Sequence, residues 1–192
     1  MGWPSSLLKS VEGRFYRAVA ADHVDRVLAA PSAQSAGRYH RPGQPALYVS
    51  READWAVIAV SRYMAEDGIA RVVLPLRLSA ARVVDQRDVQ HCAGLGIDPQ
   101  LSATRWQIAL VEHRDPPSWT NADKARELGA DGIIDPSRGI VGGWYMALFR
   151  WNAPGAPRIE VDGDPIPADY PAARSRWPSP PGWMEAAGDL TY

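Results

Sequence analysis

One stretch of the sequence organises the rest, and it reads GRYHRPGQPALYVS from Gly37 to Ser50. Its first half is a polar loop that carries two arginines and a histidine. The residues Ala46 to Val49 are too apolar for a surface loop and too short for a helix, so they predict a strand. An apolar segment with helical character follows from Asp54 to Met64. The predicted order is therefore loop, strand, turn and helix.

This order predicts an anion site beside an aromatic ring. Tyr48 lies on the predicted strand, directly after the loop that contains Arg38 and Arg41. A guanidinium group binds a phosphate or carboxylate in bidentate fashion, and it also stacks on aromatic rings. The pattern favours a ligand that bears both a phosphate and a ring. The alternatives are arginines that are solvated or paired at the surface, and a tyrosine that is merely half-buried in its strand.

The composition narrows the class of protein. A chain of 192 residues fits one domain with one sizeable core. A formal net charge of -1 argues against direct nucleic-acid binding and membrane attraction. The single cysteine, Cys92, excludes a disulfide scaffold, and the four histidines lack metal-ligand spacing, so no metal is expected. We find no apolar run of about 18 residues and no signal pattern, which fits a cytoplasmic location.

The remaining segments predict a mixed α+β domain of short strands with surrounding helices. The expected strands are 14–19, 70–78 with a continuation to 84, 132–135, 145–151 and 158–161, and the expected helices are 23–30, 54–64, 85–96 and 121–128. Residues 105–113 fit a helix or a strand, and Pro75 suggests an edge position or a bulge. Residues 1–164 form the predicted domain. Residues 165–192 form a Pro/Trp-rich tail without periodicity, draped or partly disordered.

Two more residues are candidates for the site. Arg17 lies near the end of the first predicted strand, where its guanidinium group would add to the cationic loop. Ser137, in the sequence Asp-Pro-Ser-Arg-Gly, offers a hydroxyl beside free backbone N–H groups that suit a phosphate or a ribose. The alternative for Ser137 is an ordinary turn serine.

The order of these pieces resembles the RES-domain family, named for an Arg, a Glu and a Ser. The resemblance covers roughly residues 14–152. It rests on the following segments, in order: Phe15-Tyr16-Arg17, Gly37-Arg38-Tyr39-His40, Pro45 to Ser50, a helix, Gly132 to Ser137, and Ala147-Leu148-Phe149. Members of this family are toxins of type II toxin–antitoxin modules, usually encoded beside an Xre-like antitoxin.

The resemblance implies a fold similar to the ADP-ribosyltransferase catalytic domain, with NAD as substrate. Some members degrade NAD by hydrolysis or phosphorolysis, and others modify a protein, including phosphoribosyl pyrophosphate synthetase. Carried over by motif, Arg17 lies in the NAD cleft and Arg38 binds nearby at the phosphates. Tyr48 stacks on the nicotinamide or braces it, and Ser137 is the loop serine of the family name.

The sequence departs from the family at one position. The family's glutamate is expected eleven residues beyond the tyrosine, and Ala59 stands there. A carboxylate is needed to stabilise the positive charge that develops at the anomeric carbon as nicotinamide leaves. Three explanations stay open: an inactivated variant, use of Glu52 or less favourably Asp54 instead, or a lower demand because the acceptor is a protein nucleophile. Glu52 also fits a plain acid at a helix start.

These observations leave three function classes. The first is an NAD-consuming toxin that inhibits growth, either an ADP-ribosyltransferase or an NAD glycohydrolase or phosphorylase, held as a hetero-oligomer with its antitoxin. The second is a catalytically silent binding module, which Ala59 favours. The third, a DNA-binding domain, is disfavoured by the charge. The tryptophan-rich tail is interpreted as a partner surface or as a segment packed on its own domain.

Overall fold

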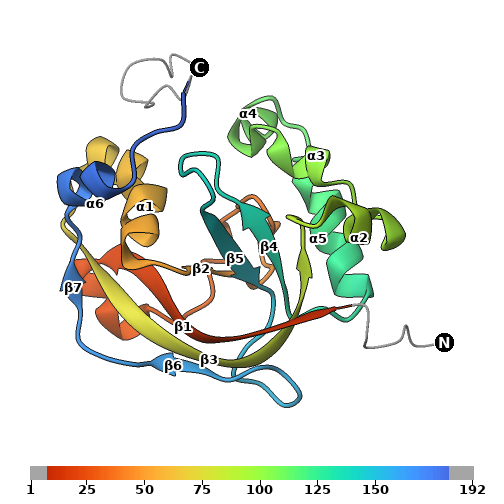
Figure 1. Ribbon diagram of the computed structural model, residues 1–192, viewed down its shortest axis with the longest axis horizontal. Helices are drawn as coiled ribbons and strands as arrows, with labels where there is room; N and C mark the ends of the chain where they lie inside the picture. The colour runs from red at the N-terminus through yellow and green to blue at the C-terminus, as the bar shows by residue number, and fades with distance from the viewer. Residues whose placement is uncertain (1–7, 182–192) are drawn as a thin grey trace.

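The structure is a computed structural model that describes residues 8–181 of the chain. It contains one mixed sheet with helices grouped on two sides (Figure 1). The strands are β1 (Lys9–Ala20), β2 (Leu47–Ser50), β3 (Arg71–Asp85), β4 (Gly132–Pro136), β5 (Trp144–Leu148), β6 (Ile159–Val161) and β7 (Ile166–Pro167). The helices are the 3-10 helix η2 (Ala21–Arg26) and α1 (Ala53–Asp67), α2 (Val89–Gly94), α3 (Pro99–Ala103), α4 (Trp106–Val111), α5 (Ser118–Glu127) and α6 (Tyr170–Arg176). The predicted mixed α+β class is confirmed.

The sheet closes on itself. Its order is β1-β2-β5-β4-β3, and β3 pairs again with β1 along nearly the whole length of both strands. The inner face holds a continuous apolar core, whose fully buried members include Phe15, Leu47, Leu76, Met146 and Leu148. Closure removes the free strand edges of this ring, and β6 and β7 extend β3 on its other side. The ring is the rigid support for the loops discussed below.

Pro75 lies inside β3 at a local edge, because a neighbouring strand pairs with it on one side only. It pairs with Tyr16 of β1 on one side. On the other side β7 pairs with residues 72 and 73 and β6 with residues 76–78, so Pro75 falls between the two partners. Its missing N–H is therefore not required, and its carbonyl oxygen accepts from the Asp162 N–H at 2.9 Å. A gap in the neighbouring strands makes the proline tolerable.

Element boundaries differ from the sequence expectation where long-range pairing decides them. β1 begins at Lys9, five residues before the predicted start, because residues 9–11 pair with residues 81–83 of β3. The predicted helix 23–30 is the shorter 3-10 helix η2, with non-helical backbone at His23. The ambiguous segment 105–113 contains α4.

Helix α1 is buried near its N-terminus and becomes more exposed toward its C-terminus. It begins after Glu52 and ends at Gly68, whose φ of 64° matches the predicted role of a C-terminal glycine. The buried residues are Trp55 to Ile58. Ala59 is exposed, and Tyr63, one turn further on, keeps 45% of its surface accessible. The position of the missing glutamate therefore lies on the open side of the helix.

The predicted tail from residue 165 begins with two ordered elements. β7 pairs with β3, and α6 packs on α1 (Figure 1). The Asp54 carboxylate accepts two hydrogen bonds of 2.6 Å from Arg176, and the rings of Trp55 and Trp177 meet edge to face. The rest of the tail, residues 182–192, lies outside the described residues.

This ion pair predicts a pH dependence for the docking of α6. The hydrogen bonds from Arg176 hold the pKa of Asp54 below its ordinary value. A carboxyl group whose pKa is lowered on folding contributes stability above its unfolded pKa of about 3.9 and loses it as pH falls through the folded pKa. We expect Asp54→Asn to destabilise the chain at pH 6, with the difference from wild type shrinking steadily below pH 4. Urea unfolding at several pH values measures it, and a difference that grows as pH falls contradicts it.

Within the described part of the chain, no helix has the length and apolar character to cross a membrane.

Candidate functional site

The loop at residues 37–41 is fastened to helix α5. Its first three carbonyl oxygens each accept a hydrogen bond from that helix. Trp119 Nε1 donates to the carbonyl of residue 37 at 2.8 Å, Ser118 Oγ to that of residue 38 at 2.5 Å, and Arg126 Nη2 to that of residue 39 at 2.9 Å. These three bonds hold the backbone of the loop and leave the side chains of residues 38 to 40 out of the contact with α5.

The Tyr48 hydroxyl is fully used inside the protein. It accepts from the Tyr39 N–H at 3.0 Å and lies 3.0 Å from His40 Nδ1. Burial raises the pKa of Tyr48 and lowers that of His40, so both are neutral near pH 7. Tyr48 therefore offers a ligand its braced ring and not an acid or base.

Gly37 is required where the loop meets Tyr48. A Cβ atom there would lie 2.4 Å from His40 Cε1 and 2.9 Å from the Tyr48 hydroxyl oxygen. We expect Gly37→Ala to destabilise the chain by about 1–3 kcal/mol, because the buried ring and hydroxyl must move. Denaturant unfolding measures the effect. Gly94→Ala is the matched control, because nothing lies within 4 Å of its Cβ position. Equal stabilities for the two variants would contradict the tight contact.

Arg17 is half-buried, and one nitrogen of its guanidinium group is buried without a hydrogen-bond partner. It lies on β1 opposite Leu74, and its Nη1 is buried with no hydrogen bond within residues 8–181. Burial lowers the pKa of Arg17 to about 10, an effect that the nearby Tyr48 phenol opposes, so the side chain stays charged near pH 7. No ion pair joins it to a carboxylate in the described part of the chain. An uncompensated buried charge is costly unless a ligand pairs with it.

Arg38 is the second arginine of this site that has no ion pair with a described carboxylate. Its Nη1 donates to the carbonyl oxygens of Ser102 at 2.5 Å and Thr104 at 2.9 Å. Burial raises the pKa values of Tyr48 and Tyr145, and the Arg38 charge opposes both shifts. The structure thus brings Arg17 and Arg38 into the electrostatic neighbourhood of Tyr48. We call these three residues the arginine–tyrosine cluster.

Arg41 is paired with a carboxylate of the protein, which was the alternative to ligand binding for each of these arginines. Its Nη1 donates to both carboxylate oxygens of Asp123, at 2.8 and 2.7 Å. Its guanidinium carbon lies 4.7 Å from the centre of the Trp119 ring. It therefore anchors the loop to α5.

The loop that joins β4 to β5, residues 137–143, carries Ser137. The Ser137 N–H donates to the Gly143 carbonyl at 2.8 Å. Arg138 donates to the Ser102 carbonyl at 2.6 Å, the same oxygen that accepts from Arg38. This shared acceptor places the loop beside Arg38. The Ser137 hydroxyl has no hydrogen bond to another described residue.

Sequence reasoning missed the buried polar group under this loop. The Asp135 carboxylate pairs with Arg138 and accepts from the Tyr145 hydroxyl at 2.5 Å. The ring of Tyr145 lies 6.3 Å from that of Tyr48, centre to centre. The only sign of this group in the sequence was Asp135 itself, two residues before Ser137 in the motif Asp-Pro-Ser-Arg-Gly.

Glu52 is not brought to the arginine–tyrosine cluster. It is exposed, caps α1 without a side-chain hydrogen bond, and has no ion pair with a described residue. Asp54 is occupied by Arg176. Ala59 is exposed on α1, one turn before Tyr63, whose phenol adds to the raised pKa of Tyr48.

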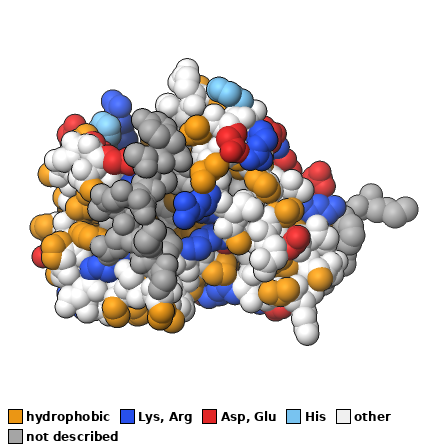
Figure 2. All heavy atoms as spheres, turned by 90° about the horizontal axis from the view of Figure 1, so that it is seen from above, with side chains coloured by type: hydrophobic (Ala, Val, Ile, Leu, Met, Phe, Trp, Pro, Cys, Tyr) orange, Lys and Arg blue, Asp and Glu red, His pale blue; other side chains and the backbone are white. Residues whose placement is uncertain are grey.

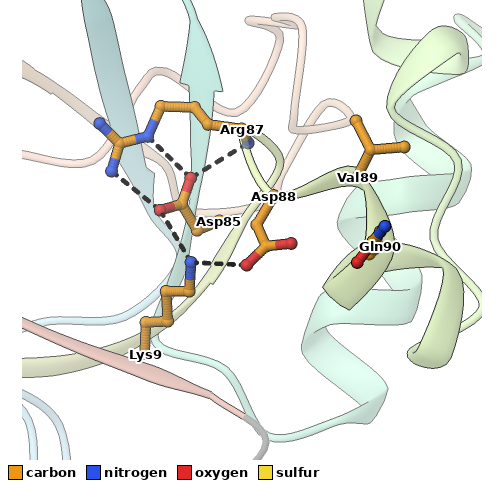
Figure 3. A pocket seen from close by; sticks show the side chains of 6 residues that line it. All are labelled: Lys9, Asp85, Arg87, Asp88, Val89 and Gln90. Atoms are coloured by element: carbon orange, nitrogen blue, oxygen red, sulfur yellow. Dashed lines mark hydrogen bonds and ion pairs between the residues drawn. The ribbon is translucent and has the colours of Figure 1, made fainter.

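Two cavities lie elsewhere. One of about 600 Å³ is lined by Lys9, Asp85, Arg87, Asp88, Val89 and Gln90 (Figure 3). Its cations are already paired: Lys9 bridges Asp85 and Asp88, and Arg87 binds Asp85. A second of about 320 Å³ lies among Glu12, Arg77, Arg158 and Glu160. Neither cavity is lined by the arginine–tyrosine cluster or by Ser137. Each is lined by two basic and two acidic side chains, so neither favours anions.

Basic side chains gather on the face between the two helix groups. Figure 2 shows Lys and Arg side chains in the middle of the face seen from above Figure 1. In Figure 1 the 137–143 loop rises between the α1–α6 side and the α3–α5 side. No group of three or more His, Cys, Asp or Glu residues suited to a metal ion occurs among residues 8–181.

Comparisons with known proteins identify the family and a similar fold. The sequence model of a family described as the RES domain matches residues 14–172. The fold is similar to a chain in the crystal structure of the M. tuberculosis MbcT–MbcA toxin–antitoxin complex. The TM-score is 0.59 at 16% sequence identity, and the match covers 88% of this chain and 90% of that one. At this identity the likeness concerns the fold alone. No curated protein matches the chain.

Proposed function

Because the chain belongs to the RES-domain family, we propose that it is the toxin of a type II toxin–antitoxin module and consumes NAD as an ADP-ribosyltransferase. The predicted site residues Arg17, Arg38, Tyr48 and Ser137 are assigned to NAD binding. The acceptor is a cellular protein, and phosphoribosyl pyrophosphate synthetase is the candidate that the family resemblance suggests.

One observation supports this proposal above the others. Two arginines without an ion pair to a described carboxylate lie within electrostatic range of Tyr48, and one of them has a buried, unpartnered Nη1. A pyrophosphate supplies the negative charge that both guanidinium groups lack and an acceptor oxygen for the unpartnered Nη1 of Arg17. A flat nicotinamide or adenine ring supplies the contact for the tyrosine. NAD combines these groups in one molecule.

The reaction breaks the bond between C1′ of the ribose and the nicotinamide nitrogen. Nicotinamide leaves as a neutral molecule, and positive charge develops at C1′ and the ring oxygen. A nucleophilic atom of the acceptor then bonds to C1′ and releases its proton to solvent. Because Tyr48 is neutral and Ala59 carries no carboxylate, the described residues around the cluster give little help to a weak nucleophile such as water. This favours a protein nucleophile over hydrolysis.

We keep Glu52 as a proposed catalytic carboxylate, although it lies apart from the arginine–tyrosine cluster. Its carboxylate is exposed and not engaged with a described residue, so it is available if α1 approaches the ligand. Replacing it separates the two explanations for Ala59. Transfer that needs Glu52 indicates a substitute carboxylate. Transfer without it indicates an acceptor that needs none.

We also assign the chain an Xre-like antitoxin as partner. The structure to which it is similar is that of a toxin–antitoxin complex. An acidic side chain or a terminal carboxylate from a partner would satisfy the same unpaired guanidinium groups as a pyrophosphate. The complex is then a hetero-oligomer in which the partner competes with NAD.

A specific observation favours a second candidate, a catalytically silent NAD-binding module. Ala59, which stands at the position of the family's glutamate, carries no charge. Binding then survives through the arginines while turnover does not.

The decisive experiment follows labelled NAD incubated with the purified chain and a cell extract. Label on one protein band supports the transferase. Free ADP-ribose or its phosphate without a labelled band identifies an NAD-degrading enzyme. Binding without turnover identifies the silent module. A chain that neither binds nor consumes NAD refutes the proposal.

A further inference from the structure

The C-terminal helix α6 contacts the loop that carries Ser137. Arg174 of α6 donates from Nη1 to the Gly139 carbonyl at 2.8 Å and to the Trp177 carbonyl at 3.2 Å. The first bond joins residues 35 positions apart in the sequence. A guanidinium group that bonds a loop carbonyl restrains the loop more firmly than a neutral donor does.

An apolar contact reinforces this bond. Ile140, the residue after Gly139, is 4% exposed and belongs to a cluster with Trp55 of α1 and Ala173 of α6. The loop is also tight, because a Cβ on Gly143 would lie 2.8 Å from the Ile140 side chain. Residues 139 and 140 of the loop are therefore held on the α1–α6 side.

Arg138 of the same loop is held from the opposite side, by α3. Arg138 pairs with Asp135 and donates to the Ser102 carbonyl of α3, where Arg38 also binds. Ser137 thus belongs to a loop that spans the two helix groups, as Figure 1 shows. A loop restrained at only one end would place its serine variably.

From these contacts we infer that Arg174 is a positioning residue: it holds residues 137–143 so that Ser137 stays beside Arg38. The role of Ser137 in NAD binding rests on the proposed function, whereas the restraint of the loop does not. Helix α6, beyond the predicted domain boundary, then serves the site and not only partner binding.

Hydrogen exchange tests the restraint without any ligand. The amide protons of Ser137 and Gly143 both lie in hydrogen bonds within the loop. We expect Arg174→Met to speed their exchange about tenfold, the size of one lost hydrogen bond to a charged donor. Arg174→Lys keeps a donor and restores much of the protection. Arg176→Met is the matched control, because it loses the Asp54 pair on the same helix but no loop contact, and it leaves these amides unchanged.

NAD titration tests the consequence for the site. Arg174→Met is expected to weaken NAD binding about tenfold, with partial rescue by Arg174→Lys and no loss in Arg176→Met. Equal exchange at Ser137 and Gly143 in the methionine variants of Arg174 and Arg176 would overturn the inference. So would intact NAD affinity in a variant whose loop exchanges faster. If wild type binds no NAD, the proposed function fails, and the exchange experiment alone decides the loop restraint.

Discussion

Arg17→Met is expected to lower NAD affinity about a hundredfold, because it removes the charged donors of the buried guanidinium group. Methionine keeps most of the apolar stem. Removing an uncompensated buried charge should also leave the free energy of unfolding unchanged or raise it by about 1 kcal/mol. The signature is therefore weaker binding in a protein that is at least as stable.

Calorimetric titration with NAD and denaturant unfolding measure the two effects. Arg105→Met is the matched control, because Arg105 is exposed and no ion pair joins it to a described carboxylate. It should change neither quantity. Unchanged NAD affinity in Arg17→Met would remove Arg17 from the site, and a strongly destabilised variant would show that its guanidinium group has structural partners.

Ala59→Glu is expected to raise the rate of NAD consumption by about 10²–10⁴-fold, the range for a positioned catalytic carboxylate. The new side chain is exposed on α1 at the position of the family's glutamate, which the family resemblance assigns to the charge that develops at the anomeric carbon. Because Ala59 is exposed, stability should change by less than about 0.5 kcal/mol.

Ala65→Glu controls for added charge, because it is exposed on the same helix but on a different face. The rate of nicotinamide release, with growth arrest on expression as a second readout, compares the two variants. Equal rates would show that the carboxylate acts without regard to position. A gain confined to position 59 marks the native chain as a disabled or carboxylate-independent member of its family.

Local pattern predicted those parts of the fold that local chemistry determines. The strand at 46–49, helix α1 with its terminal glycine and the strand at 132–135 all have strong apolar periodicity or a clear stop signal. The early start of β1 and the unbroken course of β3 through Pro75 depend on strands far away in the sequence. No local pattern carries that information.

The site shows the same division. The motifs identified Arg17, Arg38 and Tyr48, and the structure brings them into one neighbourhood. Arg38 is held by the carbonyl oxygens of residues 102 and 104. Backbone contacts of this kind cannot be predicted from a pattern of side chains. Arg174 lies in a segment without hydrophobic periodicity, so its contact with Gly139 could not be predicted from the sequence.

A crystal structure of the chain with NAD bound tests the central claim most directly. We predict the pyrophosphate within hydrogen-bond distance of Arg17 and Arg38, with one ring of the dinucleotide against Tyr48. NAD bound instead in the cavity between Lys9 and Gln90, or an arginine–tyrosine cluster that stays free of NAD at saturating concentration, would contradict it.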